Sequence, residues 1–326
     1  MTRVTVAVPL YRRFGYLQGV LRSLRAQDHA DLDILISDNG ENGPELEDRI
    51  SAELDRDYRF RRNDSTVSIS EHFNQLLQEA RGEYFVLLSD DDELSSNYIS
   101  ALSARLDEDA LAGVALGRVE VLDEAGAVVD RGERGEMPPP AMEGIDFVRR
   151  WCRHEYDFVC FVTNMMRTRD LRASGGYPHF DGGTSIDNAL VVKGSFGRRV
   201  AFVDEAEFRY RIYEASTGLS LTPERLSRDL RGFLRFLDED PALQEMARAK
   251  PQLWDETRGL LHDMTWRTYR HRWKTMYRRR LSTGEWIRAA FRMPFIPEYY
   301  HDVARTLFRT GASAAKRAVT RSGNGA

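Results

Sequence analysis

Residues 84–94 have the sequence YFVLLSDDDEL, in which five apolar residues and one serine lead into three consecutive aspartates. A short apolar run rich in aromatic and β-branched residues predicts a buried strand. Adjacent carboxylates repel one another, so they need a cation, solvent or the start of a helix beside them. The stretch therefore predicts an acidic site at the end of a strand.

Two earlier apolar runs have the same form. Residues 4–8 (VTVAV) stop at Pro9, and residues 32–37 (LDILIS) end in the turn Asp38-Asn39-Gly40. Helical spacing of apolar residues predicts helices over 16–26, 44–54 and 70–81, the last with Ser70 as its cap. This alternation predicts βαβ units and a mainly parallel sheet, whose ligands bind at the carboxyl ends of the strands.

After residue 97 the regular alternation of predicted strands and helices stops. It predicts a hairpin over 113–130, an exposed loop at 137–142, strands at 200–203 and 208–212, and helices from 222 onward. We therefore expect an α/β fold with a C-terminal helical extension, divided into a domain of residues 1–221 and an extension of residues 222–326.

Composition sets further bounds. The 326 residues carry a net charge of −4, but residues 267–326 hold 14 Lys/Arg against 3 Asp/Glu, which leaves −15 on the remainder. The two cysteines, Cys152 and Cys160, fit neither a zinc site nor a disulfide scaffold, which favours a reducing cytosolic compartment. No signal peptide or membrane-spanning stretch is predicted.

Four segments together resemble the family 2 glycosyltransferases of the GT-A fold, of the bacterial glycan-biosynthesis type. They are VTVAVPLYRR (4–13), LDILISDNG (32–40), RNDSTVSISEHFNQLLQEARGEYFVLLSDDDEL (62–94) and GGTSIDNAL (182–190). The resemblance spans about residues 4–220. It implies a Rossmann-like nucleotide-binding sheet and a nucleotide-sugar donor.

The resemblance assigns the aspartates separate roles. Ser89-Asp90-Asp91 matches the family's DxD motif, so Asp91 would bind Mn²⁺ or Mg²⁺, Asp90 would contact the ribose or the metal, and Asp92 would support them. Hard cations prefer such oxygen ligands. Ser89 stands where many relatives have Asp. The alternative is that Asp92-Glu93 caps a helix.

Other nucleotide-site residues follow from the same match. Asp38 would accept a hydrogen bond from the nucleobase, and Pro9 would lead the chain to Tyr11, whose ring would stack on the base. Arg13 and Asn74 are assigned to phosphate contact and loop support. The alternatives are an Asp-Asn-Gly turn for Asp38 and simple packing for Tyr11.

Asp187 matches the family's catalytic base, which takes the acceptor's proton in an inverting transfer. Asp181 is the alternative base, and a helix N-terminal acid is the structural alternative. Many relatives have a YRxH segment whose histidine lies near the metal, whereas this chain has Tyr213 there. Arg211 of that segment is assigned to the diphosphate, and His72 and His179 are expected in loops or at the surface.

The resemblance thus implies a metal-dependent, inverting, cytoplasmic enzyme of the hexosyltransferase type. It would transfer a sugar from a UDP- or dTDP-type donor to a glycan or lipid-linked saccharide. The alternatives are a noncatalytic sugar-nucleotide-binding scaffold and a nucleotidyltransferase. The basic aromatic tail, with Trp266, Tyr269 and Trp273, either contacts an anionic membrane at the inner face of the plasma membrane or packs on the catalytic domain. A nucleic-acid partner is not expected.

Overall fold

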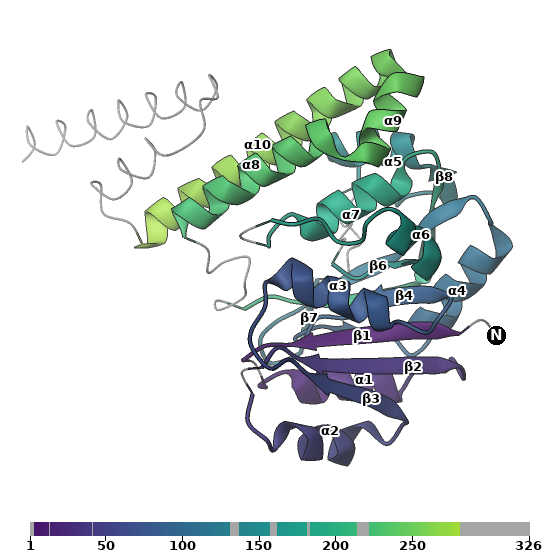
Figure 1. Ribbon diagram of the computed structural model, residues 1–326, viewed down its shortest axis with the longest axis vertical. Helices are drawn as coiled ribbons and strands as arrows, with labels where there is room; N and C mark the ends of the chain where they lie inside the picture. The colour runs from purple at the N-terminus through teal and green to yellow at the C-terminus, as the bar shows by residue number, and fades with distance from the viewer. Residues whose placement is uncertain are drawn as a thin grey trace, which may run out of the picture.

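A computed structural model describes residues 3–12, 14–40, 42–130, 137–156, 162–180, 183–213 and 222–280. The first third of the chain alternates strand and helix, as the sequence predicts (Figure 1). Its elements are β1 (Val4–Leu10), α1 (Leu17–Arg25), β2 (Leu32–Asp38), α2 (Leu46–Leu54), β3 (Tyr58–Arg62), α3 (Ile69–Glu79), β4 (Tyr84–Leu87), β5 (Glu93–Leu94) and α4 (Tyr98–Glu108).

The remaining elements extend this sheet and cover it. They are β6 (Ala112–Leu122), β7 (Val128–Asp130), β8 (Ala141–Glu143), α5 (Gly144–Cys152), β9 (Met165–Arg167), α6 (Thr168–Ala173), α7 (Ile186–Ser195), β10 (Arg199–Arg211), α8 (Pro223–Glu239), α9 (Pro241–Ala249) and α10 (Pro251–Arg280). The hairpin prediction is confirmed by the antiparallel pairing of β6 with β7.

The directions of the strands show which edge of the sheet is expected to bind ligands. The order is β3-β2-β1-β4-β9-β6-β10-β5, and β1 to β4 run parallel. β9 is antiparallel to both β4 and β6, and β10 is parallel to β6, so β10 points the same way as β4. The carboxyl ends of β1, β2, β4 and β10 therefore meet at one edge, where ligands of such sheets bind.

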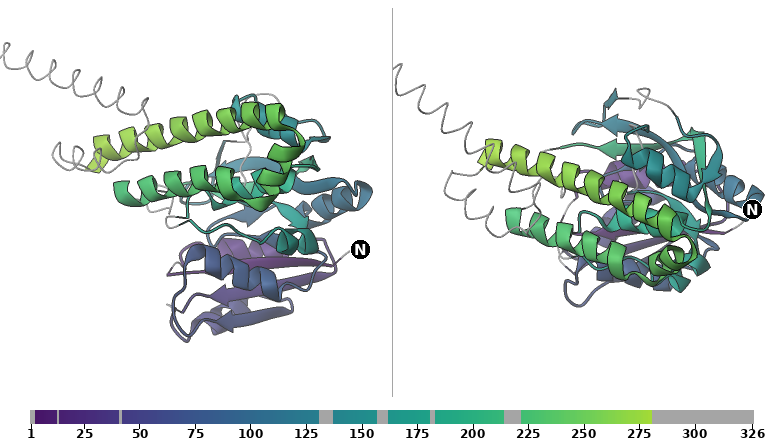
Figure 2. Two further views of the ribbon diagram at one scale, coloured as in Figure 1. Left: turned by 45° about the horizontal axis from the view of Figure 1, so that its top comes forward. Right: turned by 90° about the horizontal axis from the view of Figure 1, so that it is seen from above.

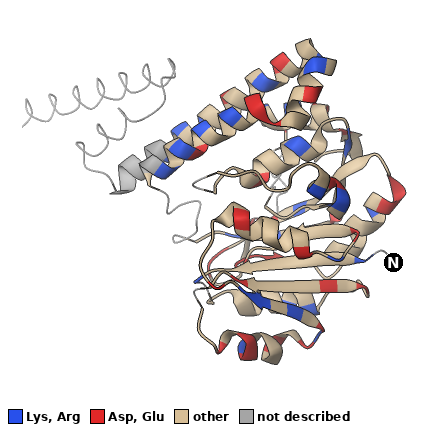
Figure 3. Ribbon diagram, in the orientation of Figure 1, with Lys and Arg blue, Asp and Glu red and all other residues tan. Residues whose placement is uncertain are grey.

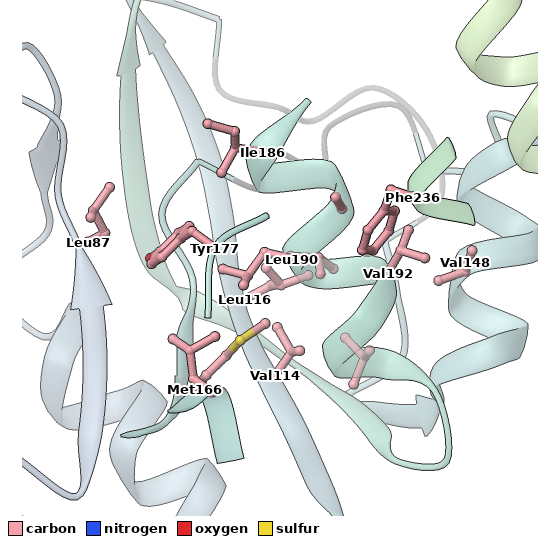
Figure 4. Packing of buried hydrophobic residues seen from close by; sticks show 14 of the residues in the cluster. Leu87, Val114, Leu116, Val148, Met166, Tyr177, Ile186, Leu190, Val192 and Phe236 are labelled. Carbon is pink, nitrogen blue, oxygen red and sulfur yellow. The ribbon is translucent and has the colours of Figure 1, made fainter. Parts of the chain in front are cut away.

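Each face of the sheet is covered by helices and has its own apolar core. Along β1, Val4, Val6 and Val8 enter one cluster with α1, α2 and α4, whereas Ala7 enters the other, as alternation along a strand requires. Figure 4 shows the second cluster between sheet and helices, including Leu116, Met166, Ile186, Leu190, Val192 and Phe236.

The C-terminal helices share this second cluster. Phe233 of α8 and Trp254 of α10 are buried in it, and α8 and α10 lie side by side (Figure 2). Trp266 and Tyr269 are buried as well, while Arg267 is exposed. The two aromatic side chains thus pack on the protein, as the packing interpretation requires. The Trp273 side chain and residues 281–326 lie outside the described part.

Three local predictions are wrong. The cap of α3 is Ser68, whose extended backbone lets its Oγ accept from the Glu71 N–H at 3.3 Å, whereas Ser70 lies inside the helix. Part of the expected loop at 137–142 forms β8 against β10. The two strands expected at 200–203 and 208–212 are one strand, β10, because an irregularity between Val203 and Glu207 absorbs its polar middle.

Within the described helices, none combines the length and the apolar composition needed to cross a membrane.

Candidate active site

Asp38 lies at the end of β2 with its carboxylate fully buried. Arg62 Nε donates to Asp38 Oδ2 at 2.7 Å, and Asn42 Nδ2 donates to Asp38 Oδ1 at 2.7 Å. The Gly40 N–H, at 3.2 Å from the same Oδ1, closes the Asp-Asn-Gly turn. The turn alternative therefore describes the local geometry, and base reading stays a prediction.

The chain after β1 reaches this turn. Asn42 Oδ1 accepts from the Arg12 N–H at 3.2 Å, so Asn42 links the segment after Pro9 to Asp38. The Tyr11 ring is 37% exposed, and the Arg12 guanidinium lies 5.0 Å from its centroid. The structure thus brings Pro9, Tyr11 and Asp38 to one corner of the site. Arg13 lies outside the described residues.

The aspartate turn follows β4 at the same edge. Asp90 and Asp92 are buried and Asp91 is half-buried. Asp92 Oδ1 accepts from the Arg211 N–H at 2.9 Å. Burial raises the pKa of Asp92 well above its ordinary value, and the neighbouring charge of Asp91 raises it further. The helix-cap alternative for Asp92-Glu93 is wrong, because Glu93 enters β5 against β10 and the next helix begins at Tyr98.

Arg211, at the end of β10, stabilises the aspartate turn through buried hydrogen bonds. Its buried guanidinium donates from Nε to the Asp91 carbonyl at 2.9 Å, from Nη2 to Glu93 Oε1 and from Nη1 to the Asp123 carbonyl at 3.1 Å. It also lies 5.1 Å from the centroid of the Tyr16 ring. These contacts give Arg211 a scaffold role, and its assignment to the diphosphate stays a prediction.

Tyr213 contacts the aspartate predicted to bind metal. Its buried hydroxyl donates to Asp91 Oδ2 at 2.6 Å, and its ring packs against Tyr16 at a centroid distance of 4.7 Å. A phenol that donates this hydrogen bond restricts the rotation of the carboxylate. The position where many relatives have histidine is therefore occupied by a residue that orients Asp91.

The donor set suits a hard cation held partly by a ligand. Among the described residues, no group of three or more His, Cys, Asp or Glu side chains is placed to hold a metal ion. Mg²⁺ binds proteins in this way through one or two carboxylates when substrate phosphates supply other ligands. Asp91, and Asp90 next to it in the chain, would hold such a metal, and substrate phosphates would supply its other ligands.

Asp187 lies in the first turn of α7 and is half-buried. Burial raises the pKa of its carboxyl, while the local backbone N–H groups and the Arg272 guanidinium act to lower it. The segment before it is tight: Gly183 has φ +80°, and a Cβ there would come within 2.8 Å of Ile69 Cδ1 at the start of α3. This packing brings the Asp187 turn to the edge of the sheet where α3 begins. Asp181 lies outside the described residues.

Asn74 supports the same region from α3. Its Oδ1 accepts from the Tyr177 N–H at 2.8 Å, and its Nδ2 donates to the Tyr177 carbonyl at 2.9 Å. Both side-chain groups are thus used in a two-bond pairing with the chain that leads to Asp187. This geometry matches loop support, and a phosphate contact by Asn74 stays a prediction.

Two residues of this site were missed from the sequence. Asp229 of α8 is fully buried, and its Oδ2 accepts from the Thr184 N–H at 2.9 Å and from the Thr184 hydroxyl. The Tyr269 hydroxyl of α10 lies 2.9 Å from Ser185 Oγ. The signal for Asp229 was available: an acid on the apolar stripe of a helix, between Leu226 and Phe233, needs a buried partner.

His72 corrects another expectation. It was expected in a loop or at the surface, but it is buried on α3 with Nε2 2.7 Å from Ser37 Oγ. Burial, together with a smaller effect of the Arg61 charge, lowers the pKa of His72 to about 4. His179 is exposed, as expected.

The site therefore combines a corner at the ends of β1 and β2, an aspartate turn after β4 and a separate half-buried acid at the start of α7. The profile of glycosyl transferase family 2 matches residues 5–172, just over half of the chain. The chain belongs to glycosyl transferase family 2. It is a glycosyltransferase enzyme with the GT-A fold, and the nucleotidyltransferase and scaffold alternatives are set aside.

Curated relatives match part of this glycosyltransferase. The Campylobacter jejuni GalNAc(5)-diNAcBac-PP-undecaprenol beta-1,3-glucosyltransferase is 31% identical over 117 residues, which are 33% of this chain and 36% of that protein. The Staphylococcus epidermidis teichoic acid poly(glycerol phosphate) polymerase is 29% identical over 102 residues, 31% of this chain and 14% of that protein. The matched segments thus span about a third and a seventh of these relatives.

Solved structures agree on the fold. Residues 1–349 of S. aureus TarS, in complex with UDP-GlcNAc, match 88% of this chain and 79% of that chain with a TM-score of 0.64 and 15% identity. The mannosyltransferase PcManGT of Pyrobaculum calidifontis, with GDP-Man and Mn²⁺, matches 96% and 80% with a TM-score of 0.56 and 14% identity.

Proposed function

We propose that this glycosyltransferase transfers a sugar, with inversion, from a UDP- or dTDP-type nucleotide sugar to a hydroxyl of a glycan or lipid-linked saccharide in polysaccharide biosynthesis. The observation that carries the proposal is the pairing of an aspartate turn, oriented by Tyr213, with a half-buried acid on a separate helix turn, Asp187, whose pKa burial raises. An inverting transfer needs these two groups apart, because the acceptor attacks opposite the leaving phosphate.

The donor binds at the corner formed by β1, β2 and β4. Tyr11 offers a ring face to the base, Asp38 accepts from its imide N–H, and Asp90 contacts the ribose or the metal. Asp91 holds Mn²⁺ or Mg²⁺; when bound, such a cation neutralises charge on the departing nucleoside diphosphate. PcManGT, which was solved with Mn²⁺ and GDP-Man, supports the metal assignment.

Asp187 acts as the general base on the acceptor side. Its carboxylate takes the proton from the acceptor hydroxyl as that oxygen bonds to the anomeric carbon and the bond to the phosphate oxygen breaks. Burial makes this carboxyl a stronger base than an exposed one, because its pKa is raised. Arg272 nearby favours the ionised form.

The acceptor class is supported by the Campylobacter relative, whose name specifies a saccharide on a diphosphate lipid. Arg225, Arg228, Arg231 and Arg235 are exposed along α8 at helical spacing, and Figure 3 shows basic positions recurring along the overlapping helices α8 and α10. Such a stripe favours the anionic surface of the plasma membrane's cytoplasmic leaflet. We therefore place the enzyme in the cytoplasm, at the inner face of that membrane.

The test of function is a donor panel. UDP- and dTDP-sugars are offered with Mn²⁺, Mg²⁺ or a chelator, and nucleoside diphosphate release, the melting temperature and the anomeric configuration of the product are measured. We expect one donor to stabilise the protein and to be turned over with inversion only when metal is present. Absence of both effects with every donor would contradict the proposal.

Membrane contact has its own test. Replacing Arg225, Arg231 and Arg235 together with glutamine should weaken sedimentation with vesicles of anionic lipid and leave zwitterionic vesicles unaffected. Because these side chains are exposed, the melting temperature should stay within a few degrees. Unchanged sedimentation would reject the α8 surface.

A further inference from the structure

A small crevice lies beside Asp187, between the first turn of α7 and the C-terminal helices. Its volume is about 30 Å³. Its lining combines polar side chains, among them Thr184, Ser185, Asn188, Thr265, Tyr269 and Arg272, with the apolar Phe233 and Met264. It is too small for a sugar ring, so it admits only the oxygens of a compact polar group.

Arg272 is the only cation among the residues that line this crevice. Its side chain is half-buried, and no described residue forms a hydrogen bond or an ion pair with it. A guanidinium has five N–H donors in a planar fork that matches the oxygens of a phosphate. Its charge acts on the Asp187 carboxyl, but its N–H donors bond to no described residue, so these donors point to an anionic ligand.

A second group in the crevice, the Thr265 hydroxyl, has no hydrogen-bond partner among the described residues. Thr265 is 4% exposed, and its Oγ1 makes no hydrogen bond within the described part of the chain. Buried hydroxyls are ordinarily hydrogen-bonded. A ligand oxygen in the crevice would supply this bond.

Other polar groups in and beside the crevice already have hydrogen-bond partners within the protein. Asp229 is occupied by the two bonds from Thr184, and Ser185 is paired with the Tyr269 hydroxyl. The N-terminus of α7 faces the same region and favours negative charge. The acids near the crevice, Asp187 and Asp229, oppose an anion, so Arg272 is the group that would hold it.

We propose that this crevice binds a phosphate group of the acceptor, carried within one sugar or polyol unit of the hydroxyl that Asp187 deprotonates. This inference rests on the proposed function and narrows its acceptor class to phosphate-bearing alcohols. Two sources share this chemistry: a monosaccharide linked through diphosphate to a lipid, and a polyol chain joined by phosphodiesters. The C-terminal helices therefore form part of the acceptor site.

The test compares three acceptors: a monosaccharide on a short prenyl diphosphate, a glycerol phosphate oligomer, and a neutral alkyl glycoside. Arg272→Gln should raise KM for the phosphate-bearing acceptor by about 10- to 100-fold, since a charge-assisted bond is lost. KM for the neutral glycoside should change far less. Arg272→Lys should recover part of the loss, and Thr265→Val should give a smaller rise of the same kind.

Arg248→Gln on α9 is the matched control, because it removes an exposed arginine that makes no ion pair with a described residue. If Arg272 acts only through Asp187, Arg272→Gln will lower kcat and move its pH profile equally for all acceptors, which overturns the subsite. A wild-type enzyme that uses only neutral acceptors overturns the subsite and leaves the proposed function intact. No transfer to any acceptor overturns both. Which phosphate-bearing acceptor is used identifies the source.

Discussion

The donor side and the acceptor side of this site are built differently. The donor corner is formed by turns that directly follow β1, β2 and β4, and Asp38 is held by residues within the next 24 positions. The acceptor side depends on helices much later in the chain: Asp229 lies 45 residues after Thr184, and Tyr269 lies 84 residues after Ser185. Asp38 is thus presented by local contacts, whereas the Asp91 turn depends on Arg211 and Tyr213 of the later chain and the Asp187 turn depends on helices later still.

The sharpest test of this division is Asp187→Asn. Transfer should fall by about 100- to 10,000-fold because the general base is lost, while donor binding persists. The measurements are kcat and the donor Kd. Asp146→Asn is the control, since Asp146 is an exposed acid in the first turn of α5. Equal loss of stability in both variants, with no selective loss of kcat, would favour a helix N-terminal role.

Asp91→Asn addresses the donor side. We expect metal-dependent nucleotide binding to be lost and transfer to fall by about 100- to 1,000-fold, because charge on the leaving diphosphate is no longer compensated. Calorimetry with UDP and Mn²⁺ measures the first effect. Asp57→Asn, at an exposed position before β3, should behave as wild type. Metal-dependent binding that survives in Asp91→Asn would remove Asp91 from the metal site.

Tyr213→Phe tests whether Tyr213 orients the Asp91 carboxylate for metal binding. The variant keeps the ring packed on Tyr16 but loses the 2.6 Å hydrogen bond to Asp91. Groups that orient a metal ligand typically contribute about 10- to 100-fold to metal affinity, so the Mn²⁺ concentration for half-maximal activity should rise by that factor. A titration of nucleotide binding against Mn²⁺ measures it directly, and an unchanged midpoint would contradict the orienting role.

Tyr269→Phe tests a residue that supports the acceptor side without taking part in the reaction. It removes the hydroxyl that pairs with Ser185 while keeping the buried ring. We expect kcat to fall by about 10-fold, with the donor Kd preserved, because one hydrogen bond that fixes the Asp187 turn is lost. Ser185→Ala should cause a similar loss, and the double variant should lose little more. Additive losses would show that the two residues act independently.

The smallest expected effect concerns His72. Between pH 6.5 and 4 the unfolded chain binds a proton that the buried, neutral His72 does not, so the free energy of unfolding falls as pH falls. The slope is about 1.4 kcal/mol per pH unit across this window. His72→Gln should flatten it, whereas His179→Gln, at an exposed position, should not. Urea unfolding at several pH values measures both, and identical slopes would refute the assignment.

Sequence patterns predicted most of the sheet and the strand ends of the donor corner because strand ends depend on local signals. An apolar run that stops at Pro9, Asp38 or Asp90 marks a strand end, and parallel ends share an edge. The same reasoning placed Asp187 at a helix start. It missed Asp229, although an acid on an apolar helix stripe signals a buried partner, and it missed the site role of Tyr269 because the contact with Ser185 joins distant helices and leaves no periodic signal.

The errors have similar causes. Asp92 was considered for a helix cap because an acid after a strand favours that position, but its carboxylate instead binds the Arg211 N–H, 119 residues later. His72 was expected at the surface, and only the packed sheet shows that Ser37 satisfies it. In both cases the partner comes from another strand of the sheet, so the decisive contact is tertiary.

The packing of α8 and α10 against the Asp187 turn has a consequence for biosynthesis of the enzyme itself. Chains emerge from the ribosome N-terminus first, and early segments fold first. The Asp38 turn can form soon after β4 appears, but the Asp91 turn lacks Arg211 and Tyr213 until β10 has emerged, and the Asp187 turn lacks its supports until α10 has emerged. The two sides of the site are therefore completed in sequence during synthesis, and the acceptor side is completed last.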